Sequence, residues 1–368
     1  MQKPNLVVKM TNKQKNILWL DLFPSLGYLK KKKLLNCTEN DADIKQSFLL
    51  NPKYKEILTE QEFAKMAQCL DEAKFNSLIE SFVNEGIEFI TIDDSRYPNQ
   101  LKEIETPPLC LYCLGNLQLL SSSCVAVVGS RKPTDYGVVV TKEYTKELSI
   151  AGLTVVSGMA VGVDSLAHRT VLENNGATIA VLAGGFHHIY PSTNIALFRQ
   201  LIENNLVITE SSPNIQSLAY LFLARNRIIA GLSQATIVTE AAEKSGSLST
   251  CRDAYEFNRK VFAVPGKINA PYSKGCNRLI KEGKAQITLE PTDILNSLGV
   301  NAEKQKMGSI QLDIKQQIII DYIKFEKKTF QEIADNTHLS PSELNSILLE
   351  LELDGLVYKL ANNSYIMA

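Results

Sequence analysis

The sequence predicts an α/β fold: a doubly wound parallel sheet with a small helical domain before it and a winged helix after it. Between residues 124 and 290, short apolar runs alternate with amphipathic helical stretches, as in a parallel sheet covered on both faces. Over residues 310–368, three helical stretches precede a hairpin, which is the layout of a winged helix. With 368 residues, the chain has room for two or three domains.

Residues 1–90 form the helical domain in this prediction. Apolar residues recur at spacings of three and four over 12–22, 60–69 and 73–85, which favours helices. Gly86 is expected to end the last of them. A bridge punctuated by prolines then leads into the sheet domain.

This bridge contains an extended segment, 109–114, with the close pair Cys110 and Cys113. Such a pair is compatible with zinc or redox chemistry, but no second pair lies at metal-ligand spacing. On a strand, residues three apart point to opposite faces. We therefore expect buried, reduced thiols, which suits a cytoplasmic protein with an odd total of seven cysteines.

The sheet domain is expected at 91–295, with its core at 124–290 and a linker, 296–309, behind it. Seven strands of the buried type are predicted at 124–128, 153–157, 178–182, 206–209, 235–239, 261–264 and 285–289. The gaps mostly hold amphipathic helices, among them 164–174, 195–204 and 247–258.

In the winged helix, the first helix is expected at 312–325. Thr329 and Ser340 each begin a capping-box pattern, which predicts the starts of two further helices. A hairpin is expected to pair 356–360 with 364–367.

The chain carries 39 basic and 40 acidic residues, so the protein as a whole is not basic. The charge is uneven, however: residues 124–290 hold 17 basic against 13 acidic residues, and 310–368 hold 5 against 9. The expected groove-facing helix, 341–354, has four acidic residues and no Lys or Arg. A polyanion site is therefore expected in the sheet domain, whereas the winged helix is expected to bind protein or assist a dimer. No apolar run has the length of a membrane span, and the N-terminus lacks the features of a signal peptide.

In an open parallel sheet, ligands bind beyond the carboxyl ends of the strands, where loops lead into helix N-termini. Glycines, serines and basic residues recur in these loops, and they suit phosphate because backbone N–H, hydroxyl and guanidinium groups all donate hydrogen bonds to its oxygens. The candidate residues of this phosphate-binding rim are Gly129, Ser130, Arg131, Ser157, Gly158, Lys244, Ser245, Gly246, Ser247, Lys267 and Asn277.

The tripeptide Arg225-Asn226-Arg227 interrupts an otherwise apolar helical segment. Two guanidinium groups are costly there unless they are paired or face a ligand. Two interpretations stay open: a structural ion pair, for example to Glu240 or Asp253, or at least one arginine facing the rim.

Several catalytic motifs are absent. The sequence has no P-loop, no Gly-x-Gly-x-x-Gly after the first strand, no His-Glu-x-x-His and no Gly-x-Ser-x-Gly. Only four histidines are present, and they offer few candidates for acid–base or metal chemistry. Acid–base or metal catalysis therefore has few candidates, and no cofactor or metal site is expected.

Together these stretches resemble the DNA-processing protein A family (DprA, also called Smf). The resemblance covers about residues 95–290, and its motifs are 127–131, 157–164 with Ala167-His168, Tyr190-Pro191, 224–233, 244–250, 263–266 and 275–280. It implies a non-catalytic protein, not an enzyme, that binds single-stranded DNA through an extended Rossmann-like domain, protects incoming strands during natural transformation (competence) and loads the RecA recombinase onto them. Members act as homodimers in DNA recombination.

The resemblance also implies roles for individual residues. Arg131 would make the first phosphate contact, and the tripeptide 225–227 and the loop 244–247 would line the same positive pocket. Bases are expected to stack on an aromatic side chain such as Phe222 or Tyr220. Two features depart from the family: the basic residue that many members carry shortly before Arg225 is missing, and the helical domain, which resembles a sterile-alpha-motif-like or helix-hairpin-helix module, has a degenerate turn.

Two other classes of protein share single features with this sequence. Phosphoribohydrolases with a related Rossmann-like fold bind nucleotides, and Glu240 could serve there as an acid, but their Pro-Gly-Gly-x-Gly-Thr loop is missing here. A regulator that binds double-stranded DNA would depend on the winged helix alone, and the acidic helix 341–354 speaks against it.

Overall fold

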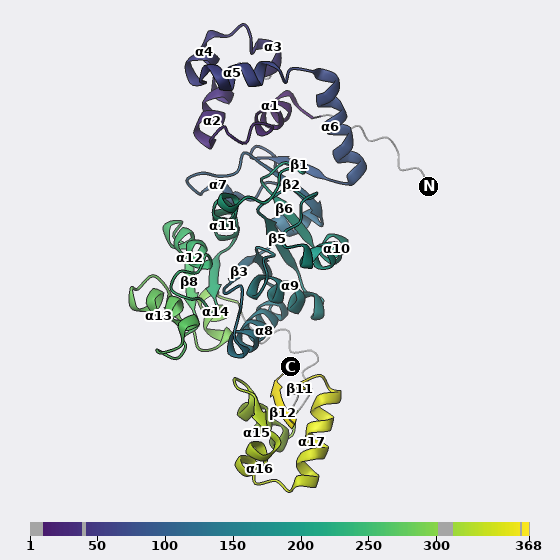
Figure 1. Ribbon diagram of the computed structural model, residues 1–368, viewed down its shortest axis with the longest axis vertical. Coiled ribbons are helices and arrows are strands. Elements are labelled where there is room, and N and C mark those ends of the chain that lie inside the picture. The colour runs from purple at the N-terminus through teal and green to yellow at the C-terminus, as the bar shows by residue number, and fades with distance from the viewer. Residues whose placement is uncertain (1–9, 39–41, 301–311, 361–362, 368) are drawn as a thin grey trace.

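The computed structural model describes residues 10–38, 42–300, 312–360 and 363–367. Its three parts follow one another along the long axis of the molecule, with the N-terminal helices at one end, the large sheet in the middle and the winged helix at the other end (Figure 1). The predicted α/β fold with a C-terminal winged helix is confirmed.

The N-terminal part consists of short helices around an aromatic core. The helices are α1 (Asn12–Asp21), α2 (Tyr28–Asn36), α3 (Ile44–Ser47), α4 (Pro52–Ile57), α5 (Glu60–Ala67) and α6 (Glu72–Glu85). Trp19 is fully buried, lies 5.1 Å from the ring of Phe48 and donates from its indole nitrogen to the carbonyl of Cys69. Gly86 ends α6 in the left-handed conformation, at φ 70°, where a residue without a Cβ is not strained.

The sheet has nine strands in the order β1-β2-β6-β5-β4-β3-β7-β8-β9. The strands are β1 (Glu88–Thr91), β2 (Cys110–Gly115), β3 (Cys124–Val128), β4 (Thr154–Ser157), β5 (Thr178–Leu182), β6 (Leu206–Thr209), β7 (Ala235–Val238), β8 (Lys260–Ala263) and β9 (Gln286–Ile287). In the part of the sheet ordered β6-β5-β4-β3-β7-β8-β9, all neighbouring strands are parallel, as predicted.

The first two strands differ from the prediction of a parallel sheet, because β1 pairs antiparallel with β2 and β2 pairs antiparallel with β6. Antiparallel neighbours need no crossover helix, so the proline-rich connection with its short helix α7 (Asn99–Lys102) is enough to join them. Cys110 and Cys113 of β2 are both buried and free, and they belong to different core clusters on the two faces of the sheet. The expectation that both thiols are buried is confirmed.

Helices cover both faces of the sheet. Val125 and Val127 face one layer, and Ala126 and Val128 face the other, because side chains alternate along a strand. The first layer consists of α8 (Asp135–Ile150), α9 (Val163–Glu173) and α14 (Pro291–Leu298). The second consists of α11 (Ala219–Leu232), α12 (Ser247–Glu256) and α13 (Lys274–Lys281).

The remaining elements of this domain are short or lie towards the N-terminal part. Helix α10 (Ile195–Asn204) packs on β2 and β6, and its Leu197 and Leu201 belong to the core cluster that extends into the N-terminal helices. Single 3₁₀ turns are η1 (Leu117–Ser121), η2 (Ser192–Asn194) and η3 (Pro271–Ser273).

The strand order reverses at β3. The chain runs from β3 through β4 and β5 to β6 on one side, and then crosses back to place β7 and β8 on the other. The loop after β3 therefore leads to α8 on one face of the sheet, and the loop after β7 leads to α12 on the other face. Ligands of open α/β sheets bind in the crevice that such a reversal leaves.

The winged helix has its own core, formed by α15 (Ile314–Ile323), α16 (Phe330–Thr337) and α17 (Pro341–Leu353) with a small sheet. That sheet has the order β10-β12-β11, with β10 at Lys328–Thr329, β11 at Val357–Leu360 and β12 at Ser364–Met367. The predicted hairpin is confirmed, whereas β10 had not been predicted.

The two predicted capping boxes of the winged helix differ in outcome. Thr329 and Glu332 form a complete capping box at the start of α16. At Ser340, the hydroxyl accepts from the backbone N–H of Glu343, but the carboxylate of Glu343 pairs with Lys315 instead of returning to the cap. The prediction of a complete capping box at Ser340 is therefore wrong, because Lys315 on α15 competes for the carboxylate of Glu343.

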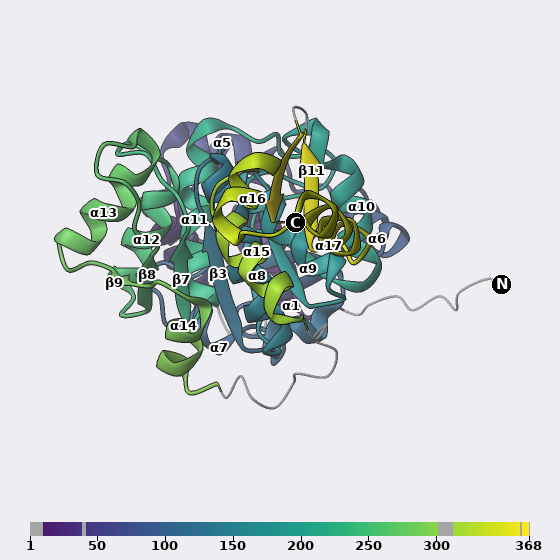
Figure 2. The same ribbon diagram turned by 90° about the horizontal axis from the view of Figure 1, so that it is seen from below.

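The winged helix lies below α8 and α9 when the molecule is viewed as in Figure 1, and Figure 2 shows it from its free side. Lys324 pairs with Glu143 of α8 at 2.9 Å, and Glu326 pairs with Lys267 at 2.8 Å. The ring of Phe325 lies 6.1 Å from that of Tyr136. Within the described ranges, none of the helices is long and apolar enough to cross a membrane.

Candidate functional site

The loops after β3 and β7 touch each other at Gly129. A Cβ on this residue would lie 2.7 Å from Val163 and 2.9 Å from the carbonyl oxygen of Glu240. The next residue, Ser130, donates its backbone N–H to that same carbonyl at 2.7 Å. Gly129 is therefore required by the close approach of the two loops at the strand reversal.

Glu240 holds the start of α8. Its two carboxylate oxygens accept from the backbone N–H of Thr134 at 2.8 Å and from the Thr134 hydroxyl at 2.6 Å. Thr134 is the N-cap of the helix and accepts in turn from Gly137. Glu240 is only 3% exposed, so this acid is part of the scaffold that positions the loop from Gly129 to Thr134.

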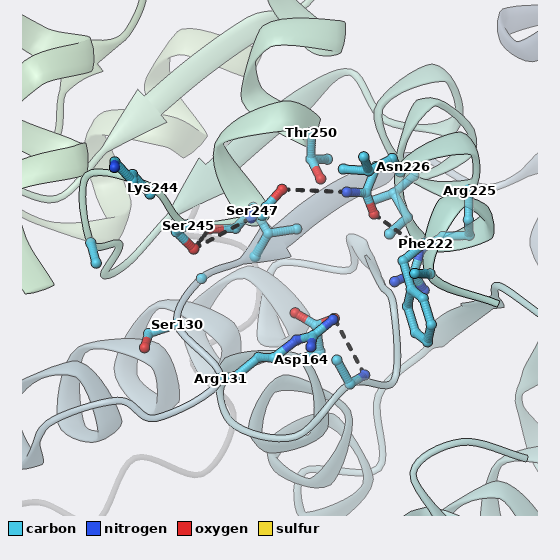
Figure 3. Close-up of a pocket in the computed structure, with 18 of the residues that line it drawn as sticks. Ser130, Arg131, Asp164, Phe222, Arg225, Asn226, Lys244, Ser245, Ser247 and Thr250 are labelled. Atoms are coloured by element: carbon cyan, nitrogen blue, oxygen red, sulfur yellow. Dashed lines mark hydrogen bonds between the residues drawn. The ribbon is translucent and has the colours of Figure 1, made fainter. Parts of the chain in front are cut away.

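A pocket of about 730 Å³ opens beside this loop, over the strand reversal. Three segments surround it: the loop after β3, the first half of α11 and the loop that leads into α12 (Figure 3). Ten of the predicted site residues line it: Gly129, Ser130, Arg131, Phe222, Arg225, Asn226, Lys244, Ser245, Gly246 and Ser247.

Arg131 and Lys244 supply the accessible positive charge of the pocket. Both side chains are exposed, and neither forms an ion pair with any residue in the described parts of the chain. The guanidinium of Arg131 lies over the ring of Phe222, 5.5 Å from its centroid, which is a cation–π contact. The contact leaves the hydrogen-bond donors of the guanidinium available, so Arg131 can bind an anion.

Ser245 and Ser247 add hydroxyl groups at the opposite wall. Their Oγ atoms lie 2.8 Å apart, and the backbone N–H of Ser247 points to Ser245. Asn226 ties this loop to α11, because its side-chain amide donates to Ser249 at 2.8 Å and to the Gly246 carbonyl at 3.4 Å. The loop before α12 is thereby held against α11.

Arg225 reaches beneath the pocket and is 6% exposed. Its guanidinium donates to the carbonyl oxygen of Gly158, the residue after β4, at 2.6 Å. It also donates to the carbonyl oxygen of Val181, the second-last residue of β5. Burial lowers the pKa of Arg225 to about 10, although Asp164 nearby acts against this shift. Burial likewise raises the pKa of Asp164, which is opposed by the charge of Arg225. The two carbonyls and the side-chain oxygen of Asn226 accept the hydrogen bonds of Arg225 within the protein.

Arg227 does not line the pocket, contrary to the prediction. Residues two apart on an α-helix point to nearly opposite sides, and Arg227 pairs with Glu210 at 2.7 Å in a separate hollow of about 250 Å³ near the N-terminal helices. The interpretation of a structural ion pair holds for this residue, with Glu210 in place of the two partners suggested from the sequence.

Four other predicted residues lie outside the pocket. The Ser157 hydroxyl is buried and donates to the Val127 carbonyl, and Gly158 leaves space for Arg225. Asn277 exchanges two hydrogen bonds with Gly266. Lys267 is bound to Glu326 of the winged helix.

The lining residues without an assigned role include Asp164, Tyr190 and Thr250. All three belong to stretches already noted as motifs, which was the available signal. Tyr220, one of the two aromatic residues suggested for stacking, does not line the pocket. In the portion of the chain that the structure describes, no group of three or more His, Cys, Asp or Glu could hold a metal ion.

Comparisons with known proteins point to one family. Residues 88–299 match the family model described as DNA recombination-mediator protein A, and residues 303–363 match that of the DprA winged helix domain. Protein Smf of Synechocystis is 42% identical over 318 residues, covering 76% of this chain and 80% of its own length. The DNA processing protein DprA of Bacillus subtilis is 40% identical over 215 residues, covering 58% of this chain and 72% of its own.

Solved structures agree. That of DNA processing protein A from Streptococcus pneumoniae has a TM-score of 0.66 at 35% identity, covering 78% of this chain and 98% of the other. A structure of DNA processing protein A from Helicobacter pylori, which is described by its single-stranded DNA binding mode, has a TM-score of 0.53 at 32% identity. The match covers 57% of this chain and 95% of the other. The chain therefore belongs to the DNA recombination-mediator protein A family.

Proposed function

We propose that this protein is a recombination mediator that binds single-stranded DNA in the pocket at the strand reversal. The observation that carries the proposal is the pair of exposed, unpaired cations, Arg131 and Lys244, on the rim of a pocket whose other donors are hydroxyl and backbone groups. Such a rim suits a chain of phosphates. The family membership and the printed description of the Helicobacter pylori relative support the choice of ligand.

Binding of this kind is mainly electrostatic and tolerates any base sequence. Phosphate contacts position a strand without reading it, and the side-chain amide of Asn226 in the pocket is already hydrogen-bonded to Arg225, Ser249 and Gly246. Of the residues predicted from the sequence, the ten that line the pocket are proposed to contact the DNA, and Ser157 and Gly158 are proposed to support the pocket from beneath. Arg227, Lys267 and Asn277 lie away from the pocket and are not part of the proposed site.

The proposed cellular role is to protect incoming strands during natural transformation and to load RecA onto them, as a cytoplasmic homodimer without enzyme activity. The family supports this role. Two assays test it: protection of a single strand from an exonuclease, and the rate at which RecA assembles on a strand precoated with single-strand-binding protein. We expect both to increase with added protein. No effect in either assay would contradict the mediator role.

The alternative of a phosphoribohydrolase-like enzyme required Glu240 as an acid. Both oxygens of Glu240 are engaged by Thr134, and the residue does not line the pocket. We therefore expect no release of base when the protein is incubated with nucleoside monophosphates. Measurable release that is lost in Glu240→Gln would favour the enzyme.

The ligand class is tested by comparing single-stranded with double-stranded oligonucleotides of equal length over a range of salt concentrations. We expect the single strand to bind more tightly at every salt concentration, and its log Kd to rise linearly with log salt. Equal affinity for both forms would contradict a single-strand site.

A further inference from the structure

Tyr190 is an exposed aromatic residue at the mouth of the pocket. It lies in the connection between β5 and η2, lines the pocket and keeps 57% of its surface exposed. Its hydroxyl has no hydrogen-bond partner among the described residues. Its place in the pocket distinguishes it from exposed aromatic residues such as Tyr220.

The ring of Tyr190 belongs to a short row of planar groups. Its centroid lies 5.6 Å from that of Phe222, and the two ring planes meet at 73°. The guanidinium of Arg131 lies over the Phe222 ring, 5.5 Å from the ring centroid. Phe222 is half-buried between these two neighbours and is therefore less accessible than Tyr190. The outermost and most accessible ring of the row is Tyr190.

We propose that Tyr190 is the stacking platform for a base of the bound strand, whose adjacent phosphate lies on Arg131. This inference rests on the proposed function and names a residue and a contact within it. A base presents a flat π face regardless of its identity, and an exposed tyrosine ring can cover that face without reading the base. The row of contacts from Arg131 through Phe222 places a cation for the phosphate and a ring for the base on the same lip of the pocket.

The chain supplies a matched control. Tyr220 is also a tyrosine, also 57% exposed, and lies on α11 only two residues from Phe222, yet it does not line the pocket. Tyr190→Ala and Tyr220→Ala therefore remove the same chemical group from equally exposed positions. Only the first is expected to change DNA binding.

The test uses the full chain and two probes of equal length and phosphate number, oligothymidylate and an abasic strand. Tyr190→Ala is expected to raise the Kd for oligothymidylate about tenfold and to leave the Kd for the abasic strand unchanged, because only the base contact is lost. Tyr190→Phe is expected to restore wild-type affinity, since it keeps the ring. Tyr220→Ala is expected to behave as wild type with both probes.

A spectroscopic readout is independent of affinity. The natural chain has one tryptophan, Trp19, which is fully buried among the N-terminal helices. Tyr190→Trp therefore adds a single exposed indole, and we expect oligothymidylate, but not the abasic strand, to quench its fluorescence. Tyr220→Trp is the control and is expected to show no quenching.

The possible failures are distinguishable. If Arg131→Ala weakens binding while Tyr190→Ala binds both probes as wild type and the indole at 190 is not quenched, the stacking proposal is wrong and the proposed function stands. If Tyr190→Ala weakens the abasic strand as much as oligothymidylate, the residue does not act through a base, and the proposal is also wrong. If Arg131→Ala leaves binding of both probes unchanged, the proposed DNA site itself is wrong.

Discussion

The guanidinium of Arg225 occupies the space that a side chain at Gly158 would need. It donates to the Gly158 carbonyl at 2.6 Å and also to the carbonyl at the end of β5. A Cβ built on Gly158 would overlap the guanidinium itself. This contact joins the carboxyl ends of two neighbouring strands and fixes the base of the pocket.

The first prediction concerns this contact. Gly158→Ala is expected to lower the free energy of unfolding by about 1–3 kcal/mol, because the added methyl group forces Arg225 from its carbonyl partners. Chemical denaturation measures the change. Gly27→Ala is a matched control, since a Cβ there meets no atom within 4 Å and the φ angle is −65°. A loss no larger than that of Gly27→Ala would contradict the prediction.

The second prediction separates Arg227 from the DNA site. Because Arg227 pairs with Glu210 outside the pocket, Arg227→Ala should leave the salt dependence of DNA binding unchanged while lowering the free energy of unfolding by about 1–2 kcal/mol. Glu210→Gln serves as the partner control and should show the same pattern. A reduced salt slope in Arg227→Ala alone would place this arginine on the phosphates after all.

The third prediction is a pH dependence of stability caused by His168. The hydroxyl of Thr178 donates to the Val155 carbonyl, so Nδ1 of His168 donates to that hydroxyl. Burial lowers the pKa of His168 to about 3, against about 6.5 when it is unfolded. Between these two values the unfolded chain binds one more proton than the folded chain, so stability falls as the pH decreases.

The slope for one proton approaches about 1.4 kcal/mol per pH unit, and it should begin below about pH 6.5. Urea denaturation of wild type and His168→Gln at pH 7, 6 and 5 isolates this contribution, because other titrating groups are common to both proteins. The difference in stability between them should narrow towards acid pH. A difference that stays constant from pH 7 to pH 5 would show that His168 does not stay neutral in the folded state.

The fourth prediction concerns the winged helix. Its longest helix, α17, presents acidic side chains and exposed Leu349 and Leu353, and Lys315 of α15 is already paired with Glu343. Because this part has its own core, a fragment of residues 310–368 can be measured alone. We expect it to bind neither single nor double strands in moderate salt. Binding with a steep salt dependence would contradict a role in protein contacts.

The sequence predicts the parallel part of the sheet closely, because buried strands and amphipathic helices have different periods. The strands at 124–128, 178–182 and 206–209 coincide with the observed ones. The antiparallel strands β1 and β2 were not predicted as part of the sheet, because strand direction depends on contacts distant in sequence. The partner of Glu343 was missed for the same reason, since Lys315 lies on another helix.

The candidate site, too, could be predicted only in part from the sequence. Residues in loops at the carboxyl ends of strands could be assigned to one rim, because parallel strands bring those ends together. What the pattern cannot give is the direction of each side chain. Arg225 and Arg227 are only two residues apart, yet one lies beneath the pocket and the other in a separate hollow. Likewise Tyr190 and Tyr220 are equally exposed, but only Tyr190 faces the pocket.

The central claim is that Arg131 contacts a phosphate of single-stranded DNA, and one titration tests it most directly. The Kd for a single strand is measured from low to moderate salt for wild type, Arg131→Ala and Arg169→Ala, the last being an exposed arginine of α9 outside the pocket. We predict that Arg131→Ala binds more weakly and that its salt slope falls by about one, while Arg169→Ala matches wild type. An Arg131→Ala protein that is folded and binds with the affinity and slope of wild type would contradict the account.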